Sequence, residues 1–186
     1  RAAFQIPFVG VVPAIKPAAI QSKTKKIGLL ATPATIKRSY TDQLINDHAS
    51  ACEVLRCGSN ELVLEAEKLI SGGSVSSEVI ENVVSVFKRS GSEERIDTIV
   101  LGCTHFPFLI SALSKALPSV FWIDSGEAIA KRVKGLLSNF EHEINAEDDS
   151  IARAQHQIYF SKTRPDESVF SKILKEIGIV DYQIND

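Results

Sequence analysis

Short apolar runs alternate with amphipathic stretches along most of this chain. The runs predict strands at residues 6–12, 27–31, 52–57, 98–101 and 120–123, with two more at 156–160 and 179–182. Helical periodicity predicts helices at residues 33–45, 61–70, 76–88, 108–117, 126–140 and 169–177. Strands that alternate with helices favour an α/β fold: a three-layer domain on a parallel sheet.

Prolines refine the first part of this pattern. Pro13 and Pro17 predict a stiff connection, suited to a crossing between domains. Thr32 and Pro33 predict the N-cap and first residue of one continuous helix, whose apolar stripe includes Tyr40.

The helix that follows residue 126 is expected to cover a core. Its apolar residues recur at helical spacing and are predicted to be buried: Ile129, Val133, Leu136, Leu137 and Phe140.

Charge and cysteine content narrow the functional classes. The 186 residues carry 21 Lys and Arg against 23 Asp and Glu, so no basic face suggests nucleic acid, and no apolar run suggests a membrane span. Three cysteines without Cys-x-x-Cys spacing argue against a disulfide framework and a zinc site. His142, in the acidic stretch 141–150, is expected to lie in a solvated loop and to bind no metal. We expect free thiols, as in the cytoplasm.

One corner gathers groups that can do chemistry. Gly102 follows a buried strand, and Pro107 favours the first turn of a helix. Cys103, Thr104 and His105 therefore lie at a strand-to-helix corner, where a parallel sheet binds ligands and the positive end of the helix dipole favours a thiolate. A buried Cys is also a common small hydrophobe, and a His after a strand is often only a turn residue.

Similar corners follow other strands. Thr32 and Thr35 place two hydroxyls after one strand, and Cys57 ends another. Because Cys57 would belong to the same sheet as Cys103, it would reach a substrate from the same side. It is therefore a poor candidate for a second, opposed thiol.

With these residues in hand, the chain resembles the glutamate racemases of the aspartate/glutamate racemase family. The resemblance includes the specific run Leu-Gly-Cys-Thr-His-Phe-Pro, and the matching segments are Pro7–Ala18, Ile27–Tyr40, Leu101–Pro107 and Asp124–Arg132. It implies two pseudo-symmetric α/β domains with no cofactor. Residues 14–117 would form the second racemase domain, 1–13 would be a strand and crossover of the first, and 119–186 the returning part of the first.

The resemblance also implies roles for individual residues. Cys103 and His105 would take part in proton transfer, with Glu67 near an acidic position that assists catalysis. Thr104, His105, Thr32 and Thr35 would bind the substrate. An activator, UDP-N-acetylmuramoyl-L-alanine, is expected near a hinge, with the candidate contacts Arg1, Gly10, Val11, Val12 and Lys16.

The chain departs from the family pattern at its start. The Cys-Asn-Thr motif with the other catalytic cysteine, an early Asp-Ser-Gly and a Tyr-Gly are not found in this sequence, and Asp124-Ser125-Gly126 is not the early motif because it follows Cys103. Inverting an α-carbon needs a base on one face and an acid on the other. We therefore expect the whole protein to interconvert L- and D-glutamate for peptidoglycan, and this chain alone to be inactive.

Two other functions stay open on the sequence. The polypeptide could be an incomplete piece that binds but does not racemise, or an aspartate racemase. A Cys–His hydrolase is a third possibility, although no further motif supports it. Association into oligomers is also left open.

Overall fold

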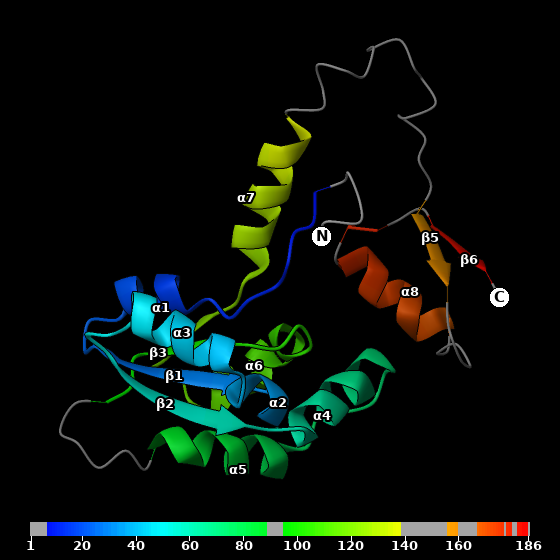
Figure 1. The fold of residues 1–186 in the computed structure, drawn as a ribbon. Helices are drawn as coiled ribbons and strands as arrows, with labels where there is room; N and C mark the ends of the chain where they lie inside the picture. The colour runs from blue at the N-terminus through cyan, green and yellow to red at the C-terminus, as the bar shows by residue number, and fades with distance from the viewer. Residues whose placement is uncertain are drawn as a thin grey trace.

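Four parallel strands form the centre of the molecule (Figure 1). The computed structural model describes residues 7–88, 95–138, 156–159, 167–176, 178–179 and 182–185. The strand order is β2-β1-β3-β4, and all three pairings are parallel. The strands are β1 (Lys26–Ala31), β2 (Glu53–Gly58), β3 (Thr98–Leu101) and β4 (Phe121–Ile123). The predicted α/β class and parallel sheet are confirmed.

Helices cover both faces of this sheet. One face carries α1 (Ile15–Gln21) and α3 (Ser39–His48). The other carries α4 (Glu61–Ile70), α5 (Ser77–Lys88), the 3₁₀ turn η1 (Phe106–Leu109) and α6 (Ile110–Ala116). The result is a three-layer domain, as the alternating pattern predicted.

The two cores are built from alternate residues of the central strands. Leu29 of β1 and Val100 of β3 pack toward α1 and α3, whereas Leu30 and Leu101 pack toward α4, α5 and α6. Gly28 also matters on this second face, because a Cβ there would lie 2.8 Å from atoms of Ile99 and Phe87. The glycine lets the Phe87 ring lie directly on the sheet.

The remaining elements lie beyond the four-stranded sheet. A short α2 (Pro33–Ile36) follows β1, and α7 (Gly126–Leu137) follows β4. A separate parallel pair of β5 (His156–Tyr159) and β6 (Tyr182–Asn185) accompanies α8 (Glu167–Glu176), which contacts α4. No helix in the described ranges is both long and apolar enough to cross a bilayer.

The predicted strand at 6–12 is wrong for the residues that the structure describes. Residues 7–14 form no strand, and Phe8, Val11 and Val12 are exposed by 46%, 58% and 39%. A strand needs a neighbour to pair its backbone N–H and C=O groups, and the described residues offer none here. Residue 6 lies outside the described residues.

Two predictions near the start also need correction. The supposed stiff connection contains α1, because a proline is tolerated in the first helical turn, where Pro17 lies. The single helix after Thr32 is two helices: the chain leaves α2 at Lys37, and Arg38 is extended before α3 begins. Tyr40 is consequently exposed by 49%.

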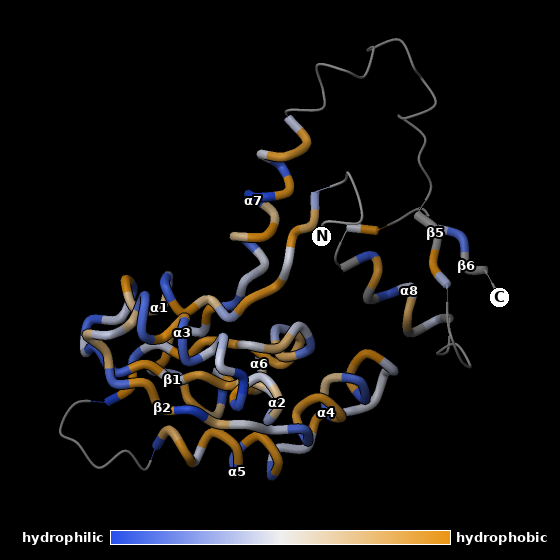
Figure 2. Tube along the Cα trace, in the orientation of Figure 1, coloured by the Kyte–Doolittle hydropathy of each residue, from blue (hydrophilic) through white to orange (hydrophobic). Residues whose placement is uncertain are grey.

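The predicted burial of the helix after residue 126 is wrong within α7. None of its residues is buried, and Leu137 is exposed by 55%. Figure 1 shows α7 projecting away from the sheet, and Figure 2 shows hydrophobic residues along it. The apolar stripe is present, but the described residues provide no layer to cover it. Phe140 lies outside them, as do residues 141–150.

The division into domains stays a prediction. One observation bears on its boundary: β4, which the division assigns to the returning part 119–186, pairs with β3 in register Thr98 to Phe121. The central sheet therefore continues past residue 117.

Asp97 ties the start of β3 to the turn before β1. Its Oδ2 accepts hydrogen bonds from the backbone N–H groups of Lys23, at 2.7 Å, and Thr24, at 3.0 Å, and its Oδ1 accepts one from Thr98 Oγ1 at 3.1 Å. Burial works to raise the pKa of this carboxyl. The nearby Ser22 hydroxyl and the hydrogen bonds from Thr24, Lys23 and Thr98 outweigh burial and lower the pKa below its usual 3.8.

We predict that Asp97→Asn lowers the free energy of unfolding by about 1 kcal/mol at pH 7, because a charged acceptor becomes a neutral one at a partly solvated site. Because the folded-state pKa is lowered, the ionised carboxyl stabilises the fold above pH 3.8 and this contribution fades as the pH falls through the lower value. Urea unfolding at a series of pH values measures both effects, with exposed Asp47→Asn as the control. A difference that grows toward low pH would contradict this assignment.

Candidate functional site

The chain reverses its direction of winding between β1 and β3. From β1 it moves outward to β2, and it later returns to β3 on the other side of β1 before reaching β4. Ligands bind outside the carboxyl ends of the strands at such a reversal. Residues 32–35 follow β1 here, and residues 102–105 follow β3.

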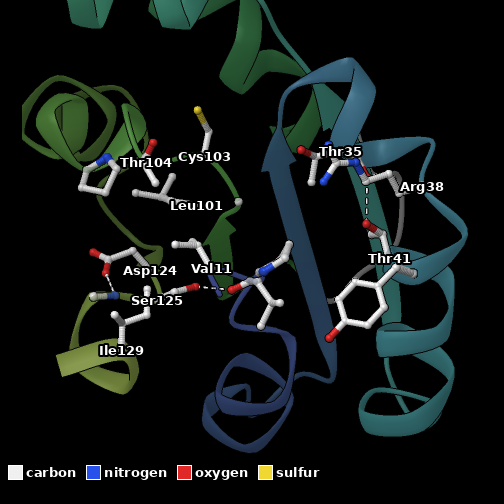
Figure 3. A pocket seen from close by; sticks show the side chains of 16 residues that line it. Val11, Thr35, Arg38, Thr41, Leu101, Cys103, Thr104, Asp124, Ser125 and Ile129 are labelled. Carbon is white, nitrogen blue, oxygen red and sulfur yellow. Dashed lines mark hydrogen bonds between the residues drawn. The ribbon is translucent and has the colours of Figure 1, made fainter. Parts of the chain in front are cut away.

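A cavity of about 230 Å³ opens at this reversal. Figure 3 shows Cys103 and Thr104 on one side of it and Thr35 and Arg38 on the other. The full lining is Val11, Val12, Pro13, Thr35, Arg38, Tyr40, Thr41, Leu101, Gly102, Cys103, Thr104, Pro107, Asp124, Ser125, Gly126 and Ile129. The lining combines a thiol, several hydroxyls, one guanidinium and one carboxylate, which suits a small polar ligand.

The Cys103 corner is held tightly against the sheet. Gly102 N–H donates to the Leu30 carbonyl at 2.8 Å, and a Cβ on Gly102 would lie 3.0 Å from Ala31 Cβ. After the corner, the fully buried Phe106 anchors η1, and its N–H donates to the Cys103 carbonyl at 3.2 Å. The expected helix after Cys103 therefore starts as a 3₁₀ turn that leads into α6.

Three of the predicted residues form a chain of contacts. His105 Nδ1 lies 3.7 Å from Cys103 Sγ, and His105 Nε2 lies 2.6 Å from Glu67 Oε1 on α4. A carboxylate only accepts hydrogen bonds, so Nε2 carries the proton and, in the neutral ring, Nδ1 faces the thiol as an acceptor. The arrangement can take a proton from Cys103 and return it. His105 and Glu67 do not line the cavity, and their link to it is the contact of His105 with Cys103.

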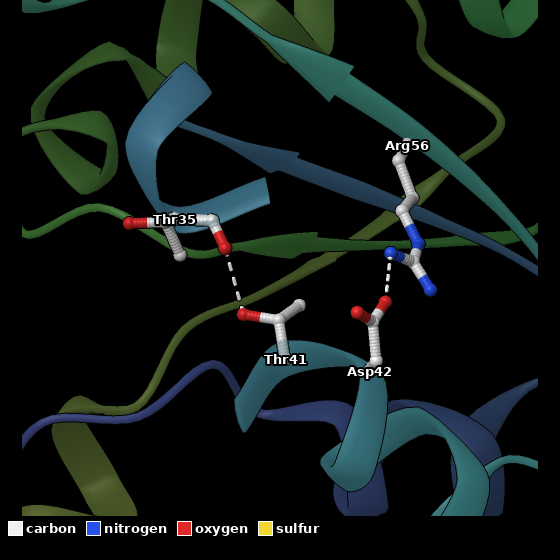
Figure 4. A network of polar contacts seen from close by, with 4 residues as sticks. All are labelled: Thr35, Thr41, Asp42 and Arg56. Atoms are coloured by element: carbon white, nitrogen blue, oxygen red, sulfur yellow. Dashed lines mark hydrogen bonds and ion pairs between the residues drawn. The ribbon is translucent and has the colours of Figure 1, made fainter. Parts of the chain in front are cut away.

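The two threonines after β1 are also brought together. Thr32 caps α2 by accepting from Thr35 N–H at 3.3 Å, and the two hydroxyl oxygens lie 3.0 Å apart. Thr35 lines the cavity, whereas Thr32 does not. The buried Thr41 hydroxyl donates to the Thr35 carbonyl at 2.7 Å and thereby fixes α2 (Figure 4).

A second contact in Figure 4 joins α3 to the sheet. Arg56 of β2 forms an ion pair with Asp42 of α3. This pair holds α3, and with it Thr41, beside the strand that neighbours β1.

The structure does not gather the predicted activator contacts at one place. Gly10, Val11 and Val12 lie in the exposed segment before α1, and only the two valines line the cavity. Lys16 is exposed on α1. Arg1 lies outside the described residues.

Sequence reasoning missed several residues of the cavity wall. Asp124 and Ser125 had a signal, because they follow β4 at another strand-to-helix corner, but the sequence analysis assigned them no role in the site. Arg38, Tyr40 and Thr41 had none, because their position depends on the break between α2 and α3.

Neither of the other cysteines lines the cavity that Cys103 borders. Cys57 is buried near the end of β2, and this burial raises the pKa of its thiol. Cys52 is partly buried and packs against the core between the sheet and helices α1 and α3. Within the described residues, no three His, Cys, Asp or Glu side chains gather into a group that could hold a metal ion.

Comparison with known proteins gives a consistent picture. Residues 1–133 match the family Asp/Glu/Hydantoin racemase. The chain is 45% identical over 175 residues to a glutamate racemase of Shewanella sp. (strain MR-4), a match that covers 94% of this chain and 63% of that relative. This chain thus spans less than two thirds of the relative's length.

Solved structures agree with the fold. A glutamate racemase of Escherichia coli, solved with L-glutamate and the activator UDP-MurNAc-ala, superposes with a TM-score of 0.82 at 37% identity, covering 98% of this chain and 66% of that one. A glutamate racemase of Bacillus anthracis superposes with a TM-score of 0.66 at 23% identity, covering 99% and 65%. The second likeness concerns the fold alone.

We predict that Cys57 is the slowest of the three thiols to be alkylated. Its burial limits access and its raised pKa lowers the thiolate fraction, whereas Cys103 borders the cavity. Timed labelling with iodoacetamide, followed by peptide mass spectrometry, measures the three rates, and Cys52 serves as a partly buried control. Equal labelling of Cys57 and Cys103 in the folded protein would contradict the placement of these thiols.

Proposed function

The chain belongs to the Asp/Glu/Hydantoin racemase family, and from this premise we propose that the protein interconverts L- and D-glutamate without a cofactor. The observation that carries the proposal is the contact chain from Cys103 through His105 to Glu67, beside a cavity at the winding reversal of the sheet. The names of the curated relatives support glutamate over aspartate.

The reaction requires a proton to leave one face of the α-carbon and another to arrive on the opposite face. In our proposal, the Cys103 thiolate removes the α-proton of L-glutamate, and in the reverse direction the Cys103 thiol returns it. The α-proton is a weak acid, so the site must also stabilise charge that grows toward the carboxylate in the transition state.

His105 and Glu67 would prepare the thiol for this step. With Nε2–H directed at Glu67 Oε1, the imidazole Nδ1 is free to accept the Cys103 proton. The imidazolium so formed lies between the thiolate and the Glu67 carboxylate, and both negative charges stabilise it. Glu67 therefore acts as a positioning residue that sets the tautomer of His105.

Hydroxyl groups around the cavity would hold the substrate. Thr35 and Thr104 border the cavity, and Thr32 orients Thr35 through their shared hydrogen bond. Neutral donors of this kind suit a carboxylate whose charge changes during the reaction.

The second acid or base would come from outside the described residues. Neither Cys52 nor Cys57 borders the cavity, and the curated relatives are longer than the span that this chain matches. We place the opposed thiol in that further part of the protein. The uncovered apolar stripe of α7 and the exposed segment 7–13 are consistent with a surface that this part would cover.

Regulation by a nucleotide is a further part of the proposal. The relative from E. coli was solved with UDP-MurNAc-ala as its activator. Gly10, Val11, Val12 and Lys16 are our candidates for a similar site here, because the segment is exposed and Lys16 offers a cation for a phosphate. We place the enzyme in the cytoplasm, where D-glutamate would supply peptidoglycan synthesis.

We predict that Cys103→Ala lowers racemisation by the whole protein by roughly 10²–10⁴-fold, the usual contribution of a general acid or base. Incubation in D₂O separates proton exchange, seen as loss of the α-proton NMR signal, from inversion, seen by circular dichroism. Cys52→Ala is the matched control and should behave as wild type.

The same measurement distinguishes the alternatives. Exchange of L-glutamate without inversion would mean that Cys103 works alone, and absence of exchange in the wild-type whole protein would refute the racemase proposal. Full activity in Cys103→Ala would show that Cys103 is not the acid or base of the reaction.

We predict that Glu67→Gln lowers kcat/KM by about tenfold, because the variant loses the charge that stabilises the imidazolium. The loss must be equal in both directions, since the equilibrium constant between enantiomers is one. The isotope effect with α-deuterated L-glutamate should rise, because the Cys103 step becomes more rate-limiting, while that with α-deuterated D-glutamate should fall. Exposed Glu61→Gln, on the same helix, is the control. An unchanged isotope effect for both enantiomers would contradict the role of Glu67.

A further inference from the structure

Two segments far apart in the sequence meet at the wall of the cavity. The Ser125 hydroxyl, at the start of α7, donates a hydrogen bond to the backbone carbonyl of Val12, 113 residues earlier (Figure 3). Val12 belongs to the exposed segment 7–13, and Ser125 to the turn between β4 and α7. Both residues line the cavity that contains Cys103.

Ser125 makes this hydrogen bond in place of the N-cap hydrogen bond that a serine usually makes at this position. Ser125 is the N-cap residue of α7, where a serine side chain ordinarily accepts a hydrogen bond from the first turn of its own helix. Here the side chain makes no such bond. Asp124 serves the turn instead, by accepting from Gly126 N–H at 2.6 Å through its Oδ1. The Ser125 hydroxyl is thus directed away from its own helix and toward segment 7–13.

Holding Val12 also determines where the next residue lies. Pro13 Cγ is 3.5 Å from the position that a Cβ on Gly102 would occupy, so Pro13 packs on the corner that carries Cys103. Pro13, Gly102 and Cys103 line the same cavity. The hydrogen bond from Ser125 therefore fixes Val12, and with it the adjacent Pro13, which packs on the backbone beside the thiol.

We propose that Ser125 is a positioning residue for the reaction: it clamps segment 7–13 against the Cys103 corner and so fixes this wall of the cavity relative to the thiol. The proposal rests on the proposed racemase function, in which a second group must face Cys103 across the substrate. A small displacement between two reacting groups lowers the rate strongly. The clamp would therefore act on kcat more than on substrate binding.

The test compares Ser125→Ala, Ser125→Thr and Ser138→Ala in the whole protein. Ser138 is the matched control, because its hydroxyl also donates to a backbone carbonyl, that of Lys134 within α7 at 2.7 Å, but joins no distant segment. Hydrogen–deuterium exchange of the peptide that covers residues 7–13 provides a measurement independent of activity. If Ser125→Ala does not fold, Ser125→Cys, which keeps the volume but donates weakly, takes its place.

We expect exchange in residues 7–13 to rise several-fold in Ser125→Ala, with exchange in β1 and β3 unchanged. We also expect kcat for glutamate to fall about five- to tenfold in both directions, with KM changed less than twofold. Ser125→Thr keeps the hydroxyl and should recover most of both effects, while Ser138→Ala should match wild type.

Each other result counts against the clamp. Ser125→Ala with wild-type exchange in residues 7–13, with exchange raised throughout the sheet, or with wild-type kcat would overturn it, and so would Ser125→Thr that is as slow as Ser125→Ala. A wild-type protein that does not racemise glutamate would refute the proposed function. The positioning role presumes that reaction, so this result would refute the positioning role as well. The exchange data would then report only whether Ser125 holds segment 7–13.

Discussion

The parallel pairing of β1 with β3 is the constraint on which the site depends. In this pairing Leu30 lies opposite Leu101, so both strands end at the same edge of the sheet. The segments that follow them bring Thr35 on one side and Cys103 on the other to one cavity, although about 70 residues separate the two in the chain. Each strand contributes one face to each hydrophobic core, and a shift in register by one residue would exchange those faces. The register that buries Leu30 and Leu101 together therefore also places the thiol.

The sequence predicted features that are visible in neighbouring residues, and missed several contacts between side chains of different elements. Thr32 was correctly predicted as a helix cap because capping involves only the next three residues. The break between α2 and α3 was missed, since it depends on Thr41 bonding back to the Thr35 carbonyl. A role for Glu67 could be proposed only by resemblance, and its contact with His105 was not predicted, because no periodicity in α4 indicates which of its carboxylates faces a residue 38 positions away. Arg38 was missed as part of the cavity wall because its position depends on the break between α2 and α3.

The apolar surface of the described residues is unevenly covered. Around the four-stranded sheet, large hydrophobic residues such as Phe106 and Leu113 are fully buried. In α7 and in segment 7–13, residues of the same kind stay exposed, although the amphipathic pattern of α7 is as regular as that of the buried helices. Periodicity reports which face of a helix is apolar, but not which part of a protein covers it. The share of the relatives' length that this chain spans is consistent with this difference.

The tight packing around Gly102 limits the size of the side chains that fit at residue 102 and at the neighbouring residue 31. A methyl group on Gly102 would press on Ala31 Cβ at 3.0 Å and on Leu29 Cδ1 at 3.2 Å. The space at this contact holds one methyl group, and it is currently contributed by residue 31. A side chain at residue 102 would therefore need Ala31 and Leu29 to give way by a few tenths of an ångström, so the small size of residue 102 and that of residue 31 act together to let the corner lie against β1.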